Sequence, residues 1–178
     1  MIEIIAVIFT LISVWLTRKE NIWCWPIGII GIVFYMILFM GDKSWANFAL
    51  QALFIIQSIH GWINWSRVDK YVIKKTSMYD LTLYVAIATL IELILPHILP
   101  KPINALDIAT TSLSIVGIYL LAIKHLEAWI FWGVADILYI MFFISTGHIV
   151  SSILYAIFLV NAILAFIEWK RIINQPTY

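Results

Sequence analysis

The chain has 178 residues, of which 63% are apolar and only 12% are charged, and its mean hydropathy is +1.00. A soluble domain carries about 25% charged residues, so this composition excludes an ordinary soluble protein. The aromatic content of 15% excludes a disordered chain, the net charge of +1 excludes a nucleic-acid-binding surface, and the single cysteine excludes an intramolecular disulfide. A polytopic membrane protein of one domain remains.

Seven apolar stretches are long enough to cross a membrane, for which about 20 mostly apolar residues are needed. Charged residues and Pro/Gly breaks separate them, and they cover approximately residues 2–17, 22–41, 45–66, 79–99, 103–123, 126–145 and 148–169. The first stretch begins with Glu3 and has its basic residues at its end, which is the reverse of a signal peptide. We therefore expect it to be the first of seven transmembrane helices.

The basic residues support a count of seven. With seven helices, Lys43 and Lys101 fall on one side of the membrane, and nine basic residues fall on the other: Arg18, Lys19, Arg67, Lys70, Lys74, Lys75, Lys124, Lys170 and Arg171. Cytoplasmic loops carry an excess of lysine and arginine. The distribution therefore predicts an N-terminus outside the cell and a C-terminus in the cytoplasm.

An internal repeat appears when the sequence is shifted by 104 residues against itself without gaps. The shift superposes residues of the same kind: Trp25 on Trp129, Tyr35 on Tyr139, Phe39 on Phe143, Trp65 on Trp169, Gln57 on Asn161 and Glu3 on Asp107. Apolar sequence seldom matches its rare tryptophans, tyrosines and amides at one offset. We predict two three-helix repeats, residues 1–67 and 103–171, joined by a connector helix over residues 78–99.

The fold class that follows is an all-α membrane protein with seven transmembrane helices in a 3-1-3 arrangement. The first and fifth helices start on the same side of the membrane, so the repeats are expected to be parallel and related by an axis along the membrane normal. Repeats of this kind place a substrate site near the midplane between the halves, and rocking of one half against the other alternates its access.

One face of the helix predicted over residues 126–145 is aromatic and acidic. Its members step by three and four residues, which places them on one side of a helix: Trp129, Trp132, Asp136, Tyr139 and Phe143. A carboxylate near the bilayer centre costs about 2.5–3.5 kcal/mol on insertion scales, unless it is paired or hydrated. Asp136 therefore indicates a cavity for a cation or a polar ring, or else a polar contact that joins helices.

Other residues extend this candidate pathway. The repeat adds the two aromatic counterparts and the midspan amides: Trp25, Tyr35, Gln51, Gln57 and Asn161. The amides fit either structural hydrogen bonds or substrate contacts. Trp25 and Trp129 fit either the pathway or an aromatic belt at the membrane interface.

The remaining tryptophans near the helix ends, Trp65 and Trp169 among them, are expected to be belt residues. Glu3, Glu92 and Asp107 lie towards the predicted outer ends of their helices, where ionisation costs little.

No motif for phosphate binding, nucleophilic catalysis or zinc hydrolysis is present. The four histidines lie on separate predicted helices and loops, without the spacing of a metal site. We expect a protein that is not an enzyme and that has neither a metal site nor a cofactor.

The motifs of both halves resemble the PnuC family of bacterial vitamin transporters. In the first half the resemblance lies in residues 21–28, Tyr35, Leu50, Gln51, Phe54 and residues 61–65; in the second half it lies in Asp107, residues 112–114, residues 127–136, residues 154–160 and Trp169. It covers nearly the whole chain, and the tryptophan and Gly-Trp-x-x-Trp elements are fairly specific.

The resemblance implies a fold like that of SWEET sugar transporters, a location in the bacterial inner membrane, and facilitated uptake of a vitamin that a cytoplasmic kinase then traps by phosphorylation. It implies binding residues on the second, third, sixth and seventh helices: Gln51, Gln57, Trp129, Trp132, Asp136, Tyr139 and Asn161.

The expected substrate is nicotinamide riboside, whose ring carries a fixed positive charge. Thiamine is the alternative, because Asp136 replaces an asparagine of some riboside-type members, and riboflavin or a neutral sugar is a further one. The partners are the vitamin and the lipid bilayer; assembly into a homo-oligomer is left open.

Overall fold

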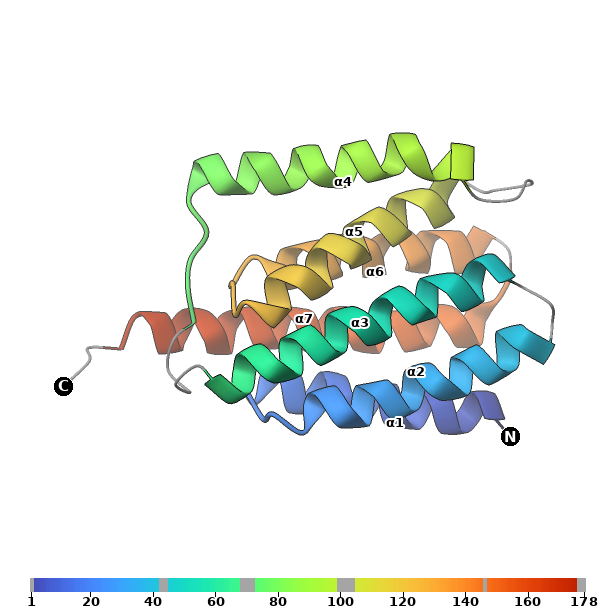
Figure 1. Ribbon diagram of the computed structural model, residues 1–178, viewed down its shortest axis with the longest axis horizontal. Coiled ribbons are helices and arrows are strands. Elements are labelled where there is room, and N and C mark those ends of the chain that lie inside the picture. The colour runs from blue at the N-terminus through green and yellow to red at the C-terminus, as the bar shows by residue number, and fades with distance from the viewer. Residues whose placement is uncertain (1, 42–44, 68–72, 99–104, 146, 176–178) are drawn as a thin grey trace. The chain divides into compact units, whose positions relative to one another are not determined.

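The computed structural model describes residues 2–41, 45–67, 73–98, 105–145 and 147–175. The described residues form seven α-helices in the predicted order (Figure 1). They are α1 (Ile2–Arg18), α2 (Cys24–Gly41), α3 (Trp45–Arg67), α4 (Met78–Ile98), α5 (Ala105–Ala122), α6 (Ala128–Ser145) and α7 (Ile149–Ile173). The predicted all-α fold of seven helices is thus confirmed. Three of the basic residues used above, Lys43, Lys70 and Lys101, lie outside the described residues.

The largest difference in helix bounds is at the end of α7, which continues beyond the predicted residue 169 to Ile173. Lys170 and Arg171 stand in its last turn. Basic side chains there interact favourably with the negative end of the helix dipole, so these residues extend the helix rather than end it.

The chain divides into two compact units, residues 1–72 and 73–178. In the N-terminal unit α2 packs against α1 and α3, and in the C-terminal unit α5 packs against α4 and α6 while α6 packs against α7. Each contact joins helices that are neighbours in the chain. The predicted repeat boundaries and their parallel relation stay predictions.

Apolar side chains cover the outside of these helices. On α6 the exposed ones are Ile130, Val134, Ile137, Met141 and Ile144, which again step by three and four residues. This face lies opposite the aromatic and acidic face of the same helix. Within the described residues, four segments are long and apolar enough to cross a membrane by length and composition: Cys24–Gly41, Met78–Ile98, Ala128–Ser145 and Ser151–Ile173.

A right-angle contact between two indoles packs the start of α2 against the end of α3 in the N-terminal unit. The rings of Trp25 on α2 and Trp65 on α3 lie 5.4 Å apart between centroids with an interplanar angle of 89°. Gly61, one helical turn before Trp65, lies directly against the benzene ring of Trp25, so a Cβ at that position would overlap the ring. Helices without a side chain at the contact approach most closely in a membrane.

The C-terminal unit contains the same contact at the repeat-related positions. Trp129 on α6 and Trp169 on α7 lie 5.4 Å apart at 87°, and the counterpart of Gly61 is the fully buried Ala165. The belt assignment of Trp65 and Trp169 is wrong, because these side chains are 5% and 0% exposed. They pack inside the protein instead of contacting lipid headgroups.

The turns that lead into α2 and α6 also match. Glu20 and Lys124 have positive φ angles of 51° and 57°. In each turn the N–H of the following residue bonds the carbonyl five residues back, from Asn21 to Leu16 at 3.0 Å and from His125 to Leu120 at 2.9 Å. This is a Schellman ending of α1 and of α5, with a long charged side chain at the position that glycine usually occupies.

In the C-terminal unit, the segment before α4 is tied to the turn between α5 and α6. Lys74 N–H bonds the Lys124 carbonyl at 2.9 Å, and Leu126 N–H bonds the Lys74 carbonyl at 2.9 Å. The buried carboxylate of Glu127 accepts the Thr76 N–H at 2.8 Å. Lys74 and Lys124 therefore lie side by side at the start of α6, where the Trp129–Trp169 contact also brings the basic end of α7. The orientation of the chain in the membrane stays a prediction.

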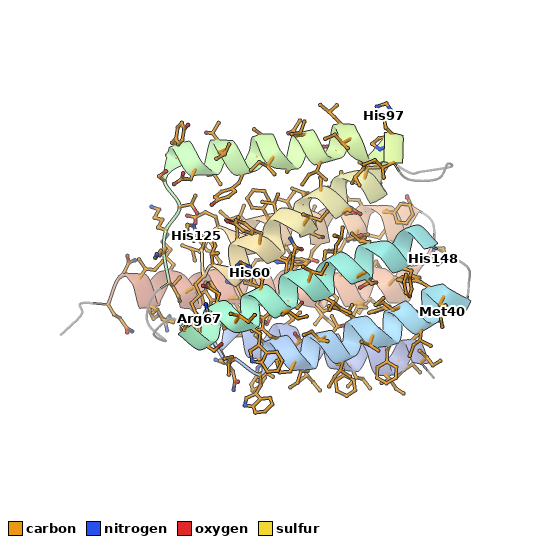
Figure 2. All side chains as sticks on the ribbon, in the orientation of Figure 1. Met40, His60, Arg67, His97, His125 and His148 are labelled. Atoms are coloured by element: carbon orange, nitrogen blue, oxygen red, sulfur yellow. The ribbon has the colours of Figure 1, made fainter. Side chains whose placement is uncertain are left out.

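His125 lies in the same turn (Figure 2), and its Nδ1 is 2.8 Å from the Thr76 hydroxyl. Burial lowers the pKa of the imidazole below its usual value, and the charge of Lys74 lowers it further, whereas the carboxylates of Glu127 and Asp80 act to raise it. The folded protein therefore favours neutral His125.

We predict that Gly61→Ala destabilises the protein, because the added methyl group overlaps the Trp25 ring. Overpacking of a buried contact costs about 1–3 kcal/mol, which should appear as a lower melting temperature of the purified protein in detergent. Gly41→Ala is the control, since a Cβ there would meet nothing within 4 Å. Equal melting temperatures for the two variants would contradict the close Gly61–Trp25 contact.

A second prediction concerns pH. Since the folded pKa of His125 is depressed, its unfolded form binds the proton more tightly, so stability is fully present above the unfolded pKa of about 6.5 and falls as the pH drops below it. His125→Asn introduces the residue type found at the counterpart position, Asn21. This variant should show a smaller fall in melting temperature between about pH 7.5 and pH 5.5. The same fall in both proteins would rule out His125 as its source.

Candidate functional site

The aromatic and acidic face of α6 points into the C-terminal unit. Asp136 is 4% exposed, and Ala135 beside it is 1% exposed. The sequence spacing thus identified the buried side of α6. Trp132 lies one helical turn before Asp136 and Tyr139 one turn after it, so the three side chains form a column along the helix.

Asp136 is buried without a protein partner within the described ranges, where it makes no hydrogen bond and no ion pair. The alternative that it joins helices through a polar contact therefore finds no support in the described residues. A buried carboxylate that lacks such a contact requires a proton, water or a cationic ligand. Asp136 is the residue of this face with the clearest capacity to bind a positive charge.

The indole of Trp132 rests on α5 at Gly117. A Cβ placed on Gly117 would lie 3.1 Å from Trp132 Nε1 and 3.3 Å from both Cδ1 and Cε2. Three ring atoms at nearly equal distances put that Cβ over the face of the five-membered ring rather than beside its edge. One face of Trp132 is therefore backed by helix α5.

Three indole N–H groups are buried without a hydrogen-bond partner in the described part of the chain: those of Trp25, Trp129 and Trp132. A buried donor that makes no hydrogen bond costs about 1–3 kcal/mol. Because Trp25 and Trp129 are repeat counterparts, the same unsatisfied donor occurs at the same place in both units.

Tyr139 stacks on a residue that the sequence-based site did not include. Its ring lies 4.4 Å from the ring of Tyr155 on α7, at 28°, and Phe143 lies 5.4 Å from Tyr155. One face of Tyr139 is thus covered by Tyr155. The sequence shows Tyr155 on the last predicted helix, but spacing within one helix does not reveal its neighbour on another.

Trp25 and Trp129, both predicted as site residues, are 4% exposed and engaged in the indole pairs described above. Their observed role is to pack α2 on α3 and α6 on α7. Any contact of theirs with substrate stays a prediction.

The other predicted residues are half-buried. Tyr35 lies on α2 beside Phe39, with ring centroids 6.2 Å apart, just as Tyr139 and Phe143 lie 6.0 Å apart on α6. Gln51 and Gln57 lie on α3, and Asn161 lies on α7. The structure thus gathers Trp132, Asp136, Tyr139 and Asn161 within the C-terminal unit and places Tyr35, Gln51 and Gln57 in the N-terminal unit.

The histidines come from separate elements, and Figure 2 labels them on α3, at the end of α4, between α5 and α6 and before α7. Among the residues with described positions, no three His, Cys, Asp or Glu side chains approach closely enough to hold a metal ion.

Comparison with known proteins identifies the fold. A solved structure described as the crystal structure of the vitamin B3 transporter PnuC matches 97% of this chain and 81% of its own, with a TM-score of 0.80 and 19% identity. The nicotinamide riboside transporters PnuC of Escherichia coli K12 and of Shigella flexneri are each 23% identical over 189 residues, covering 88% of this chain and 79% of theirs.

Outwardly apolar helices with an inward carboxylate and aromatic rings are the features of a multi-pass membrane protein whose buried charge serves a function. The model of one transporter family matches residues 1–171. The chain belongs to that family, the nicotinamide mononucleotide transporters, and the predicted resemblance is confirmed.

Proposed function

We propose that this protein takes up nicotinamide riboside across the bacterial cytoplasmic membrane by facilitated diffusion. The names of the two relatives support this substrate, and the alignment with them covers most of both chains. The observation that carries the proposal is the buried Asp136, which lacks a partner in the described structure and lies one turn from the Trp132 ring. A fixed cationic ring complements both groups.

The physical basis is the combination of an aromatic face with a carboxylate. A cation over a tryptophan ring gains about 2 kcal/mol or more when water is excluded. Asp136 adds a Coulomb attraction and accepts hydrogen bonds from ribose hydroxyls. Because α5 covers one face of Trp132, the other face is the one proposed to meet the nicotinamide ring.

The remaining assignments are proposals of the same kind. Tyr139 supplies a second aromatic surface, and Asn161 binds a polar edge of the substrate. In the N-terminal unit Gln51 and Gln57 supply amide contacts. Trp25, Tyr35 and Trp129 complete the proposed set.

The direction of transport is set by what happens to the substrate. The sequence carries no ATP-binding motif, so the proposed carrier opens its site to the two sides of the membrane in turn, without an energy source of its own. A cytoplasmic kinase that phosphorylates the vitamin keeps its free concentration low and draws it inward. The N-terminus lies outside and the C-terminus in the cytoplasm, in keeping with the distribution of basic residues.

A thermal-shift panel tests the proposed function directly. Purified protein is heated with nicotinamide riboside, thiamine, riboflavin or a hexose, because a ligand that binds the folded state raises its melting temperature. We expect stabilisation by nicotinamide riboside and none by riboflavin or the hexose. Stabilisation by thiamine alone would replace the proposed substrate, and conversion of the riboside to a product would contradict a carrier.

The role of Asp136 gives a quantitative prediction. Asp136→Asn should weaken binding of nicotinamide riboside by about 1–3 kcal/mol, the value of a hydrogen bond to a charged group, as measured by calorimetry. Glu92→Gln is the matched control, since it removes a carboxylate from an exposed position of α4. Unchanged affinity in Asp136→Asn would remove this residue from the site.

A further inference from the structure

A pair of contact positions differs between the two units. In the C-terminal unit Gly117 of α5 meets Trp132 of α6. The positions 104 residues earlier are Ser13 on α1 and Gly28 on α2, and a Cβ at Gly28 would lie 2.7 Å from the Ser13 hydroxyl oxygen. Each pair contains one glycine, but the glycine lies on opposite helices of the pair.

In the N-terminal unit the contact joins two small residues, Ser13 and Gly28. The hydroxyl of Ser13 donates a hydrogen bond of 2.8 Å to the Cys24 carbonyl, which joins the end of α1 to the start of α2. With Gly28 where the other unit has Trp132, no ring is present at this position of α2. The small contact is what a close helix pair in a membrane requires.

In the C-terminal unit the exchange makes room for an aromatic ring. A Cβ on Gly117 would lie 3.1–3.3 Å from three atoms of the Trp132 pyrrole ring. A methyl group normally stays near 3.5–4.0 Å from carbon, so the ring would have to move by a few tenths of an ångström. The absence of a side chain at residue 117 fixes how far the indole sits from α5.

We propose that Gly117 is a positioning residue for the substrate, acting through Trp132. It seats one face of the indole on α5 so that the opposite face and the Asp136 carboxylate reach the cationic ring together. This inference rests on the proposed function. It adds a reason why only the C-terminal unit presents an aromatic ring here. In that unit the glycine lies on α5 and the ring on α6, whereas the N-terminal unit has its glycine, Gly28, at the position of the ring.

The test compares Gly117 with Gly133, the residue that follows Trp132 in α6. Gly117→Ala should weaken nicotinamide riboside binding about tenfold, because the displaced indole loses its cation–π contact with the substrate. Gly133→Ala is the matched control: its Cβ would meet only Leu159 Cδ1, at an ordinary 3.7 Å. The control should bind like the wild type. Equal affinity in all three proteins overturns the inference.

A double-mutant cycle separates positioning from a general loss of packing. In a Trp132→Ala background, Gly117→Ala should change the affinity by less than about twofold, because the ring it displaces is gone. It should also raise the melting temperature of that background, since the methyl group fills part of the vacated space. Independent effects that multiply in the double variant would overturn the inference.

The cycle also covers a single variant that folds poorly. If Gly117→Ala is unstable and removal of Trp132 restores it, the contact is as described; if removal does not restore it, the methyl group meets something else and the inference fails. The wild-type measurement separates failure of the proposed function from failure of this inference. A wild type that does not bind nicotinamide riboside refutes the proposed function, whereas a binding wild type matched by Gly117→Ala refutes this inference alone.

Discussion

The right-angle indole pair is the contact on which each unit depends. In hydrocarbon the hydrophobic effect does not drive helices together, so close packing must do so. An aromatic pair contributes about 0.5–1.5 kcal/mol beyond its burial. Trp25 with Trp65, and Trp129 with Trp169, join the beginning of one helix to the end of the next. The small residues Gly61 and Ala165 allow that approach.

Around this shared frame the two units differ in chemistry. They share the indole pairs, the left-handed turns at Glu20 and Lys124, and the neighbouring Tyr–Phe rings of α2 and α6. They differ at the proposed ligand site: Ile32 stands at the position that corresponds to Asp136. A carboxylate in the interior is costly. The packing contacts therefore occur in both units, whereas the buried Asp136 carboxylate occurs in one.

The sequence predicted the helices well because charges, prolines and glycines mark their ends and the apolar runs are long. It also predicted which side of α6 is buried, since spacing alone defines a helical face. It could not predict what that face meets. Position near a helix end predicts a belt residue, yet Trp65 and Trp169 pack inside the protein. The contacts of Gly117 with Trp132 and of Tyr155 with Tyr139 depend on the register between helices. Spacing within one helix carries no information on that register.

The neighbour-to-neighbour packing within each unit bears on how the protein is made. Because α2 contacts α1 and α3, and each later contact in the C-terminal unit likewise joins consecutive helices, a newly inserted helix finds a partner in the segment synthesised just before it. Contacts between close segments form fast, and chains fold from the N-terminus during synthesis. The order of translation is therefore also an order of assembly, and the N-terminal three-helix unit is able to complete its packing while the ribosome is still producing the helix that carries Asp136.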